Sequence, residues 1–464
     1  MQKSILITST ILFYFSFFTN SYSQSHLSDS LKIKLYSETA TMIVKSSLNE
    51  NRGYDFLKEL CAIGPRLSGS ENSLNAINWA KEKLIEIGAD SVWLQPVMVP
   101  HWERGNIEDA YLLNPNGKRK LNILALGGSV GTPENGITAG VVEVKSFDEL
   151  ESKDVKGKIV FYNRPLDKGL IETFTAYGKA VDQRVYGAIN AAKYGAIGVL
   201  VRSVTTEDDN VPHTGVMLYA DTLQKIPAVA LGVQDAEYLS QQLKINPALK
   251  VQLRLNCKTL HDAKSYNVIG EIKGTEHPNE VIVVSGHIDS WDVGCGAHDD
   301  GAGCVQSIEV LDLFKRLNIK PKRTIRCVLF INEENGSRGA KKYGEFAESS
   351  TDKHIAAIES DRGGFVPIGF SYQTDSENIV EKLNSWLPIL SKAEIWWIKP
   401  GGTGSDISKI NNIKLLLGYV PDPQRYFDFH HSPKDVFETV HPRELELGTA
   451  TITTMVYLIS EEGL

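Results

Sequence analysis

The sequence predicts an α/β fold in which short buried strands end in polar loops and lead into helices. The clearest unit begins with the four apolar residues Val281–Val284, which are typical of a buried strand. A glycine-rich loop follows, and a helix is expected to begin near Ala302. The apolar face of that helix would contain Val305, Ile308, Leu311, Phe314 and Leu317. Because open α/β sheets bind ligands at the carboxyl ends of their strands, this loop is a candidate site.

The loop contains His287, Asp289, Asp299 and Asp300. An imidazole and several carboxylates suit a divalent metal with nitrogen and oxygen ligands. Alone the signal is weak, because Asp-Asp-Gly is also typical of a turn that caps a helix.

Three further apolar runs are followed by acidic or histidine residues that could also bind a metal. They are Thr324–Ile331, Ala356–Glu359 and Leu415–Val420. The residues that follow them are Asn332-Glu333-Glu334, Ser360-Asp361 and Phe429-His430-His431. Several successive strands that end in metal-type ligands predict one metal centre at the edge of one sheet.

With these motifs in view, the chain resembles the co-catalytic zinc peptidases of the M28 type, and within them the carboxypeptidase Q branch. The motifs GHIDSWDVGCGAHDDGAG, NEENGSRGA, ESDRGG and FHHSPKD occur in the family's order, and the resemblance extends from about Asn51 to the C-terminus. It implies a mixed central sheet flanked by helices, the phosphorylase/hydrolase-like fold of zinc exopeptidases, and two Zn²⁺ ions per chain.

The resemblance also implies a role for each matching residue. His287 and Asp361 would hold one ion, Glu334 and His431 the other, and Asp299 would bridge them. Two such ions, about 3.5–4 Å apart, can share a water, lower its pKa and polarise the scissile carbonyl.

Five more residues are expected near the metals. Glu333 would be the general base, and Asp289 would support His287. His430 stands where other branches have a Tyr that helps to hold the oxyanion, and an imidazole could donate the same hydrogen bond. Ser405 and Asp406 resemble a pocket-lining loop, and both substrate recognition and a structural role stay open for them.

Two neighbouring positions are ambiguous. Arg362 could receive a substrate carboxylate by a bidentate contact, but a solvated or ion-paired surface arginine is favoured. His298 is expected to be a spectator, because the motif already supplies five ligands.

The chain is expected to divide into four segments. Residues 1–23 resemble a secretory signal peptide, with an apolar run too short for a membrane span of about 20 residues; an uncleaved anchor is the alternative. Residues 24–120 begin the catalytic domain, with a helix from Glu71 that buries Leu74, Ile77, Leu84, Ile85 and Ile87 and stops at Gly88. Residues 121–255 resemble an inserted protease-associated domain that would act as a lid, with His213 and Asp208-Asp209 as solvated surface. Residues 256–464 contain the metal-binding part.

Composition limits the possible partners. The 464 residues are 42% hydrophobic and 23% charged, and the formal charge of −8 argues against nucleic acid or an anionic membrane. Of five cysteines at least one must be unpaired; Cys295 and Cys304 could pair, and buried free thiols are equally open.

The sequence therefore predicts an exported, secreted or periplasmic dizinc exopeptidase that hydrolyses short peptides or dipeptides with free termini. No membrane contact is expected after signal cleavage, and relatives suggest a homodimer. Two alternatives stay open. A glutaminyl-cyclase-like acyl transferase would hold one zinc, and a metal-stabilised peptide-binding scaffold would not need Glu333.

Overall fold

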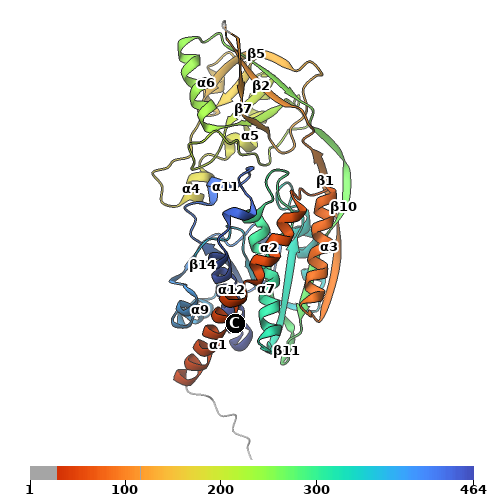
Figure 1. Ribbon diagram of the computed structural model, residues 1–464, viewed down its shortest axis with the longest axis vertical. Helices are drawn as coiled ribbons and strands as arrows, with labels where there is room; N and C mark the ends of the chain where they lie inside the picture. Colours follow the sequence, from red (N-terminus) through yellow and green to blue (C-terminus); the bar gives the residue numbers. More distant parts are fainter. Residues whose placement is uncertain (1–28, 115–116) are drawn as a thin grey trace, which may run out of the picture.

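In the computed structural model, residues 29–114 and 117–464 are described, and they form two eight-stranded sheets that lie one above the other along the long axis (Figure 1). The segment predicted to be a signal peptide lies outside the described residues. Within the described ranges, no helix combines the length and apolar character that a membrane crossing needs.

The first sheet is mixed, as predicted, and has the strand order β1-β10-β12-β11-β13-β16-β14-β15. Strands β12, β11, β13 and β16 are mutually parallel, and the pairs β1·β10, β10·β12 and β14·β16 are antiparallel. The strands are β1 (Ser91–Glu103), β10 (Lys258–Ile272), β11 (His277–His287), β12 (Arg323–Phe330), β13 (Lys353–Glu359), β14 (Pro367–Gln373), β15 (Trp397–Pro400) and β16 (Leu415–Pro421).

The central strands are buried on both faces, which is why they read as continuous apolar runs. In β11, Ile282 and Val284 pack into one core, while Val281 and Val283 pack into a second core on the opposite face. The helices of the first core are α1 (Asp29–Glu50), α2 (Arg52–Ile63), α3 (Glu71–Glu86), α7 (Ala302–Arg316), α9 (Glu377–Ser385), α10 (Leu387–Leu390) and α12 (Pro442–Glu462). Helix α8 (Arg338–Ser349) covers the opposite face.

Helix α3 starts at Glu71, as predicted, and Gly88 follows its end in the left-handed conformation (φ 79°). The prediction that Leu74 and Ile85 face the core was wrong, because 36% and 56% of these residues are exposed. The buried stripe consists of Ser73, Ala76, Ile77, Ala80 and Leu84, and the two exposed residues lie on its flanks.

All strands of the second sheet come from one stretch of chain, between Glu108 and Leu255, and their order is β3-β2-β9-β5-β6-β7-β8-β4. The strands are β2 (Glu108–Asn114), β3 (Gly117–Leu121), β4 (Ile123–Ala125), β5 (Ile137–Val144), β6 (Ile159–Tyr162), β7 (Gly198–Arg202), β8 (Ala228–Leu231) and β9 (Lys250–Leu255). The helices of this stretch are α4 (Thr173–Gly178), α5 (Asp182–Lys193) and α6 (Val233–Ile245). We call residues 108–255 the upper module.

The long antiparallel pair β1·β10 joins the upper module to the first sheet along one side of the molecule (Figure 1). On the other side, α4 lies next to α11 (Tyr426–Phe429), where the Phe174 ring stacks on Tyr426 with centroids 5.3 Å apart. A third contact joins Gly127 of the upper module to Trp291 of the loop after β11. The Trp291 ring packs against Gly127, where any side chain would collide with the indole. The upper module is therefore packed directly over the carboxyl ends of the central strands.

Candidate metal centre

The predicted ligands meet at the carboxyl ends of three neighbouring parallel strands. His287 is the last residue of β11, Glu334 follows β12, and Asp361 follows β13. Asp299 comes from the turn Ala297–Gly301 before α7, and His431 from the loop after α11. Residues 144 positions apart in the chain thus come together because parallel strands end at the same edge.

Asp299 lies at the middle of the group. Its Oδ1 is 3.3 Å from His287 Nε2, and its Oδ2 is 3.2 Å from His431 Nε2. On the outer sides, His287 Nε2 is 3.4 Å from Asp361 Oδ1, and His431 Nε2 is 3.1 Å from Glu334 Oε2. Two histidine-carboxylate pairs therefore share one carboxylate.

The donor set fits metal ions. His287 Nε2, Asp299 Oδ2 and Glu334 Oε1 are buried and have no hydrogen-bond partner among the described residues. A cavity of about 10 Å³, close to the size that holds one water, is bordered by Asp299, Glu334 and His431. Buried polar atoms without partners are costly, and a cation between them would satisfy all three.

Electrostatics lead to the same conclusion. Burial and then the charge of Asp299 raise the pKa of Glu334 to about 8. Burial also raises the pKa of Asp361 to about 6, against the opposing effect of His287. For His431, burial lowers the pKa but Glu334 and Asp299 outweigh it and raise the pKa to about 9. In the absence of a cation these buried groups therefore favour their protonated forms, and a divalent cation could take the place of those protons.

Asp289 supports His287 differently from the prediction. Its main-chain carbonyl lies 3.0 Å from His287 Nδ1, whereas its carboxylate Oδ1 is 3.9 Å away. The carboxylate instead accepts the main-chain N–H groups of Asn332 (2.7 Å) and Glu333 (3.2 Å). Asp289 therefore fixes both the His287 ring and the turn that places the two glutamates.

Two acids outside the five predicted ligands, Asp300 and Asp435, hold the main chain around those ligands. Asp300 accepts from the N–H groups of His287 (2.9 Å) and Gly303 (3.0 Å), although its carboxylate also lies near His287 and Asp361. Asp435 accepts from the N–H groups of His298 (2.7 Å) and Asp299 (3.1 Å). Their places in the DDGAG and FHHSPKD motifs were the available signal.

Glu333 lies beside the ligands at a half-buried position, where Ser405 Oγ donates to its Oε1 at 2.5 Å. Asp406 is only 1% exposed, and its N–H donates to the buried Glu359 at 3.1 Å. Gly404 (φ 143°) sits against that carboxylate, where a side chain would collide. Ser405 is thus open to the solvent, and Asp406 lies beneath it.

His430 and His298, which stand next to predicted ligands in the sequence, are both buried. His430 stacks on His431 with ring centroids 3.5 Å apart, and burial followed by the His431 charge lowers its pKa well below the usual value. Its Nε2 is 3.6 Å from Asp299 Oδ2, so its predicted catalytic role stays a prediction. His298 stacks on Phe365, and burial lowers its pKa to about 3, as suits a spectator.

The upper module contacts the same loop. His213, expected to be solvated, is 2% exposed, and its Nδ1 lies 2.7 Å from the His430 carbonyl. The expectation was wrong because the upper module packs on the metal centre. The Thr214 N–H donates to the His431 carbonyl at 2.9 Å.

The five cysteines are free, so Cys295 and Cys304 do not pair; Cys304 Sγ donates to the His287 carbonyl at 3.0 Å. Arg362 is half-buried and makes no ion pair with a described residue. Its Nη2 donates to the Gly402 carbonyl at 3.0 Å, and its guanidinium carbon lies 4.9 Å from the Phe174 ring centroid.

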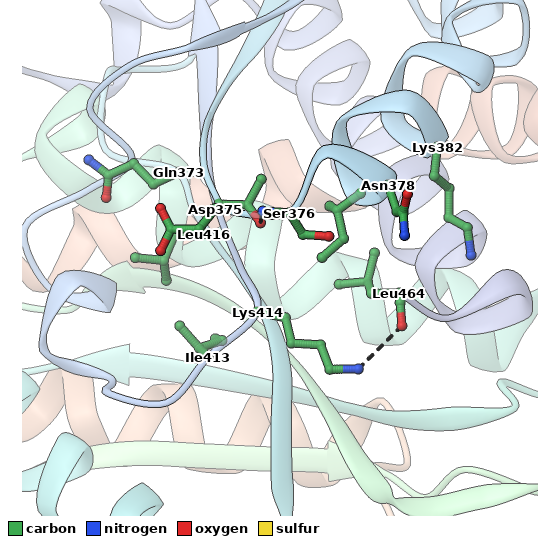
Figure 2. Close-up of a pocket in the computed structure, with 11 residues that line it drawn as sticks. Gln373, Asp375, Ser376, Asn378, Lys382, Ile413, Lys414, Leu416 and Leu464 are labelled. Atoms are coloured by element: carbon green, nitrogen blue, oxygen red, sulfur yellow. Dashed lines mark hydrogen bonds between the residues drawn. The ribbon is translucent and has the colours of Figure 1, made fainter.

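A cavity of about 780 Å³ lies elsewhere, between α9, the loop before β16 and the C-terminus (Figure 2). Lys414 Nζ there donates to the Leu464 carbonyl at 3.3 Å. Its lining shares no residue with the metal centre, and it presents no group of metal ligands. The chemistry of the side chains, rather than the size of the cavity, identifies the site.

Fold and site together define a metallo-exopeptidase, and comparison with known proteins agrees. The model of peptidase family M28 matches residues 267–456. Carboxypeptidase Q from Bos taurus is 38% identical over 437 residues, which cover 93% of this chain and 90% of the relative. The human carboxypeptidase Q is 39% identical over 420 residues, 89% of this chain and 86% of its own length.

Solved structures give the same answer. The M28 peptidase precursor of Shewanella amazonensis superposes with a TM-score of 0.89 at 30% identity, over 93% of this chain and 98% of that one. A zinc aminopeptidase from Bacillus subtilis shares the fold, with a TM-score of 0.62 at 21% identity over 86% and 93% of the two chains. The chain belongs to peptidase family M28.

Proposed function

We propose that this protein is an exported dizinc exopeptidase that hydrolyses dipeptides and other short peptides with free termini. The observation that supports it most is the Asp299 carboxylate, whose two oxygens face His287 and His431, each of which has a second carboxylate beside it. Under this proposal His287 and Asp361 hold one zinc, Glu334 and His431 hold the other, and Asp299 is shared.

The chain's own residues then divide the work. When bound, the two ions supply Lewis acidity toward water and toward the scissile carbonyl. Because Glu334 serves as the ligand, the carboxylate of its neighbour Glu333 is left free to act as general base. It takes the proton of the attacking water and passes it to the leaving amine. The Ser405 hydroxyl, which donates to Glu333 Oε1, holds that carboxylate in place before substrate arrives. The Ser405 oxygen can also accept a hydrogen bond from the substrate. Asp406 is buried, and its main-chain N–H donates to Glu359, which fixes the loop that contains Ser405.

Arg362 is the candidate for recognition of the substrate carboxylate. Its guanidinium spans the gap between the Gly402 carbonyl and the Phe174 ring of the upper module, next to the ligand Asp361. Burial lowers the pKa of Arg362, and this effect outweighs the opposing charges, of which Asp361 is the largest. A half-buried arginine without an ion-pair partner has donors left for a carboxylate.

The upper module would act as an inserted domain that limits substrate size. Helix α4 lies next to α11 (Figure 1), and the Phe174 ring stacks on Tyr426, which lies four residues before His430, so we expect the upper module to restrict the space beside the metal centre. Export rests on the N-terminal sequence, and the homodimer stays a prediction.

The test is hydrolysis of a dipeptide panel by purified mature protein, with zinc counted per chain and Glu333→Gln beside it. We expect the wild type to cleave, the variant to lose about 10²–10⁴-fold in kcat, and both to hold two zincs. Glu438→Gln, an acid on a surface turn after Val436, is the matched control and should leave activity unchanged. Two zincs without hydrolysis by the wild type would refute the peptidase proposal, and one zinc would favour the acyl-transferase alternative.

A further inference from the structure

The loop that presents His431 is held from the upper module. His213 Nδ1 lies 2.7 Å from the His430 carbonyl, and the Thr214 N–H donates to the His431 carbonyl at 2.9 Å. His431 itself has φ 59°, in the left-handed region that a residue with a side chain rarely adopts. Such a conformation persists only when its surroundings enforce it, and two of the surrounding contacts come from the upper module.

The upper module also faces the second nitrogen of His431. His431 Nε2 points at Asp299 and Glu334, and its Nδ1 lies 3.3 Å from the Thr214 carbonyl. If Nε2 is to bind a metal it must be unprotonated, so Nδ1 has the proton and donates it to that carbonyl. Among the described residues, both hydrogen-bonding neighbours of this nitrogen, the Thr214 carbonyl and Arg184 Nη1, belong to the upper module.

Arg184 secures the same carbonyl. Its Nη1 is 3.3 Å from the Thr214 oxygen and 3.4 Å from His431 Nδ1, and its Nη2 donates to the Tyr177 hydroxyl at 2.7 Å. Since Nδ1 has a proton, Arg184 and His431 both donate to the Thr214 oxygen rather than to each other. Arg184 is buried and forms no ion pair with a described residue, and Gly215 (φ 136°) packs on its guanidinium.

The other histidine ligand is oriented without help from the upper module. His287 Nδ1 faces the carbonyl of Asp289, two residues further along its own loop. The two halves of the centre therefore differ: one is oriented within the first sheet, and the other across the boundary with the upper module.

We propose that His213, Thr214 and Arg184 are positioning residues for His431, so that the upper module completes one of the two metal sites and leaves the other intact. This inference rests on the proposed dizinc function. The upper module is then part of the metal centre in addition to being a lid. Burial lowers the pKa of His213 to about 4, so it is a neutral donor toward the His430 carbonyl at neutral pH.

The test is zinc binding by the full chain, titrated against a chelator, in His213→Ala and His213→Asn. Loss of a partner that orients a metal ligand typically costs 10–100-fold in affinity, so we expect His213→Ala to weaken one zinc by about that factor and leave the other unchanged. His213→Asn retains a donor close to the Nδ1 position and should recover most of the loss. His354→Ala removes another buried histidine, whose Nε2 is 3.0 Å from the Tyr343 hydroxyl, and controls for general destabilisation.

The outcomes separate this inference from the proposed function. A wild type that binds fewer than two zincs contradicts the dizinc proposal itself. If the wild type binds two zincs and His213→Ala leaves both affinities unchanged, or weakens both equally, the positioning role is overturned. Should His213→Ala fail to fold, Arg184→Met gives the same test, because it removes a donor to the Thr214 carbonyl and keeps the apolar stem.

Discussion

Replacement of Arg362 by Gln should change the substrate specificity of the enzyme more than its turnover rate. Gln retains a donor for the Gly402 carbonyl, now 3.0 Å from Nη2, but removes the positive charge and the contact with the Phe174 ring. If the guanidinium binds the C-terminal carboxylate of the substrate, the substitution should lower kcat/KM for a dipeptide with a free C-terminal acid. It should leave kcat/KM unchanged for the same dipeptide with a C-terminal amide.

The size of the effect follows from the surroundings of the side chain. Hydrogen bonds to charged groups contribute about 1.5–3 kcal/mol, and Arg362 is half-buried, so solvent screens it only in part. A loss of about 2 kcal/mol corresponds to a roughly 30-fold fall in kcat/KM for the free acid. Without competing ion pairs to break, little of this free energy is offset.

The assay measures kcat/KM for an acid and amide pair of one dipeptide in wild type, Arg362→Gln and Arg425→Gln. Arg425 is exposed, with its guanidinium carbon 5.4 Å from the Phe429 ring centroid, and serves as the matched control. We expect the wild type to prefer the acid and only Arg362→Gln to lose that preference. A wild type without preference, or an equal loss on both substrates, would show that Arg362 does not bind the carboxylate.

Three further predictions concern groups around the site and the core. Glu309→Gln should raise the free energy of unfolding by about 1–3 kcal/mol at about pH 8, because burial and then Glu446 raise the pKa of Glu309 well above 4.5. Because the raised pKa lets the folded state bind more protons than the unfolded state, the wild-type free energy of unfolding falls as pH rises from about 4.5. Urea unfolding at several pH values should show that the variant loses this contribution to the pH dependence; the same pH dependence in both proteins would contradict the prediction. Asp289→Asn should weaken zinc about tenfold or more in chelator competition, since it disturbs the turn that positions Glu333 and Glu334; wild-type affinity would show that the contact is dispensable. Gly127→Ala should lower the melting temperature through collision with the Trp291 ring, whereas Gly140→Ala, with open space around it, should leave it unchanged.

Local sequence was sufficient to predict the central strands and to single out the side chains that meet at their carboxyl ends. The runs around Val281–Val284 and Thr324–Ile331 are apolar because β11 and β12 are buried on both faces, and Glu334 had to follow its strand to reach the common edge. Helix α3 shows the limit of that reasoning. Its start at Glu71 was readable, but exposure of Leu74 and Ile85 depends on where the first sheet lies against it.

Contacts between distant segments could not be read in this way. His213 and Arg362 have no neighbour in sequence that explains them, because their partners are His430, Gly402 and Phe174. The Asp289 carboxylate was expected on His287, yet two main-chain N–H groups of the next strand's turn occupy it.

By itself, therefore, the sequence determined the class of fold and predicted a set of metal ligands that the structure brings together, because burial and metal chemistry restrict which residue types can stand at those positions. Only the tertiary structure decided how the upper module packs on that centre, which nitrogen of His431 faces the ligands, and which partner Arg362 has. These features depend on directional contacts between residues up to 217 positions apart, and hydrophobic periodicity records burial but not direction.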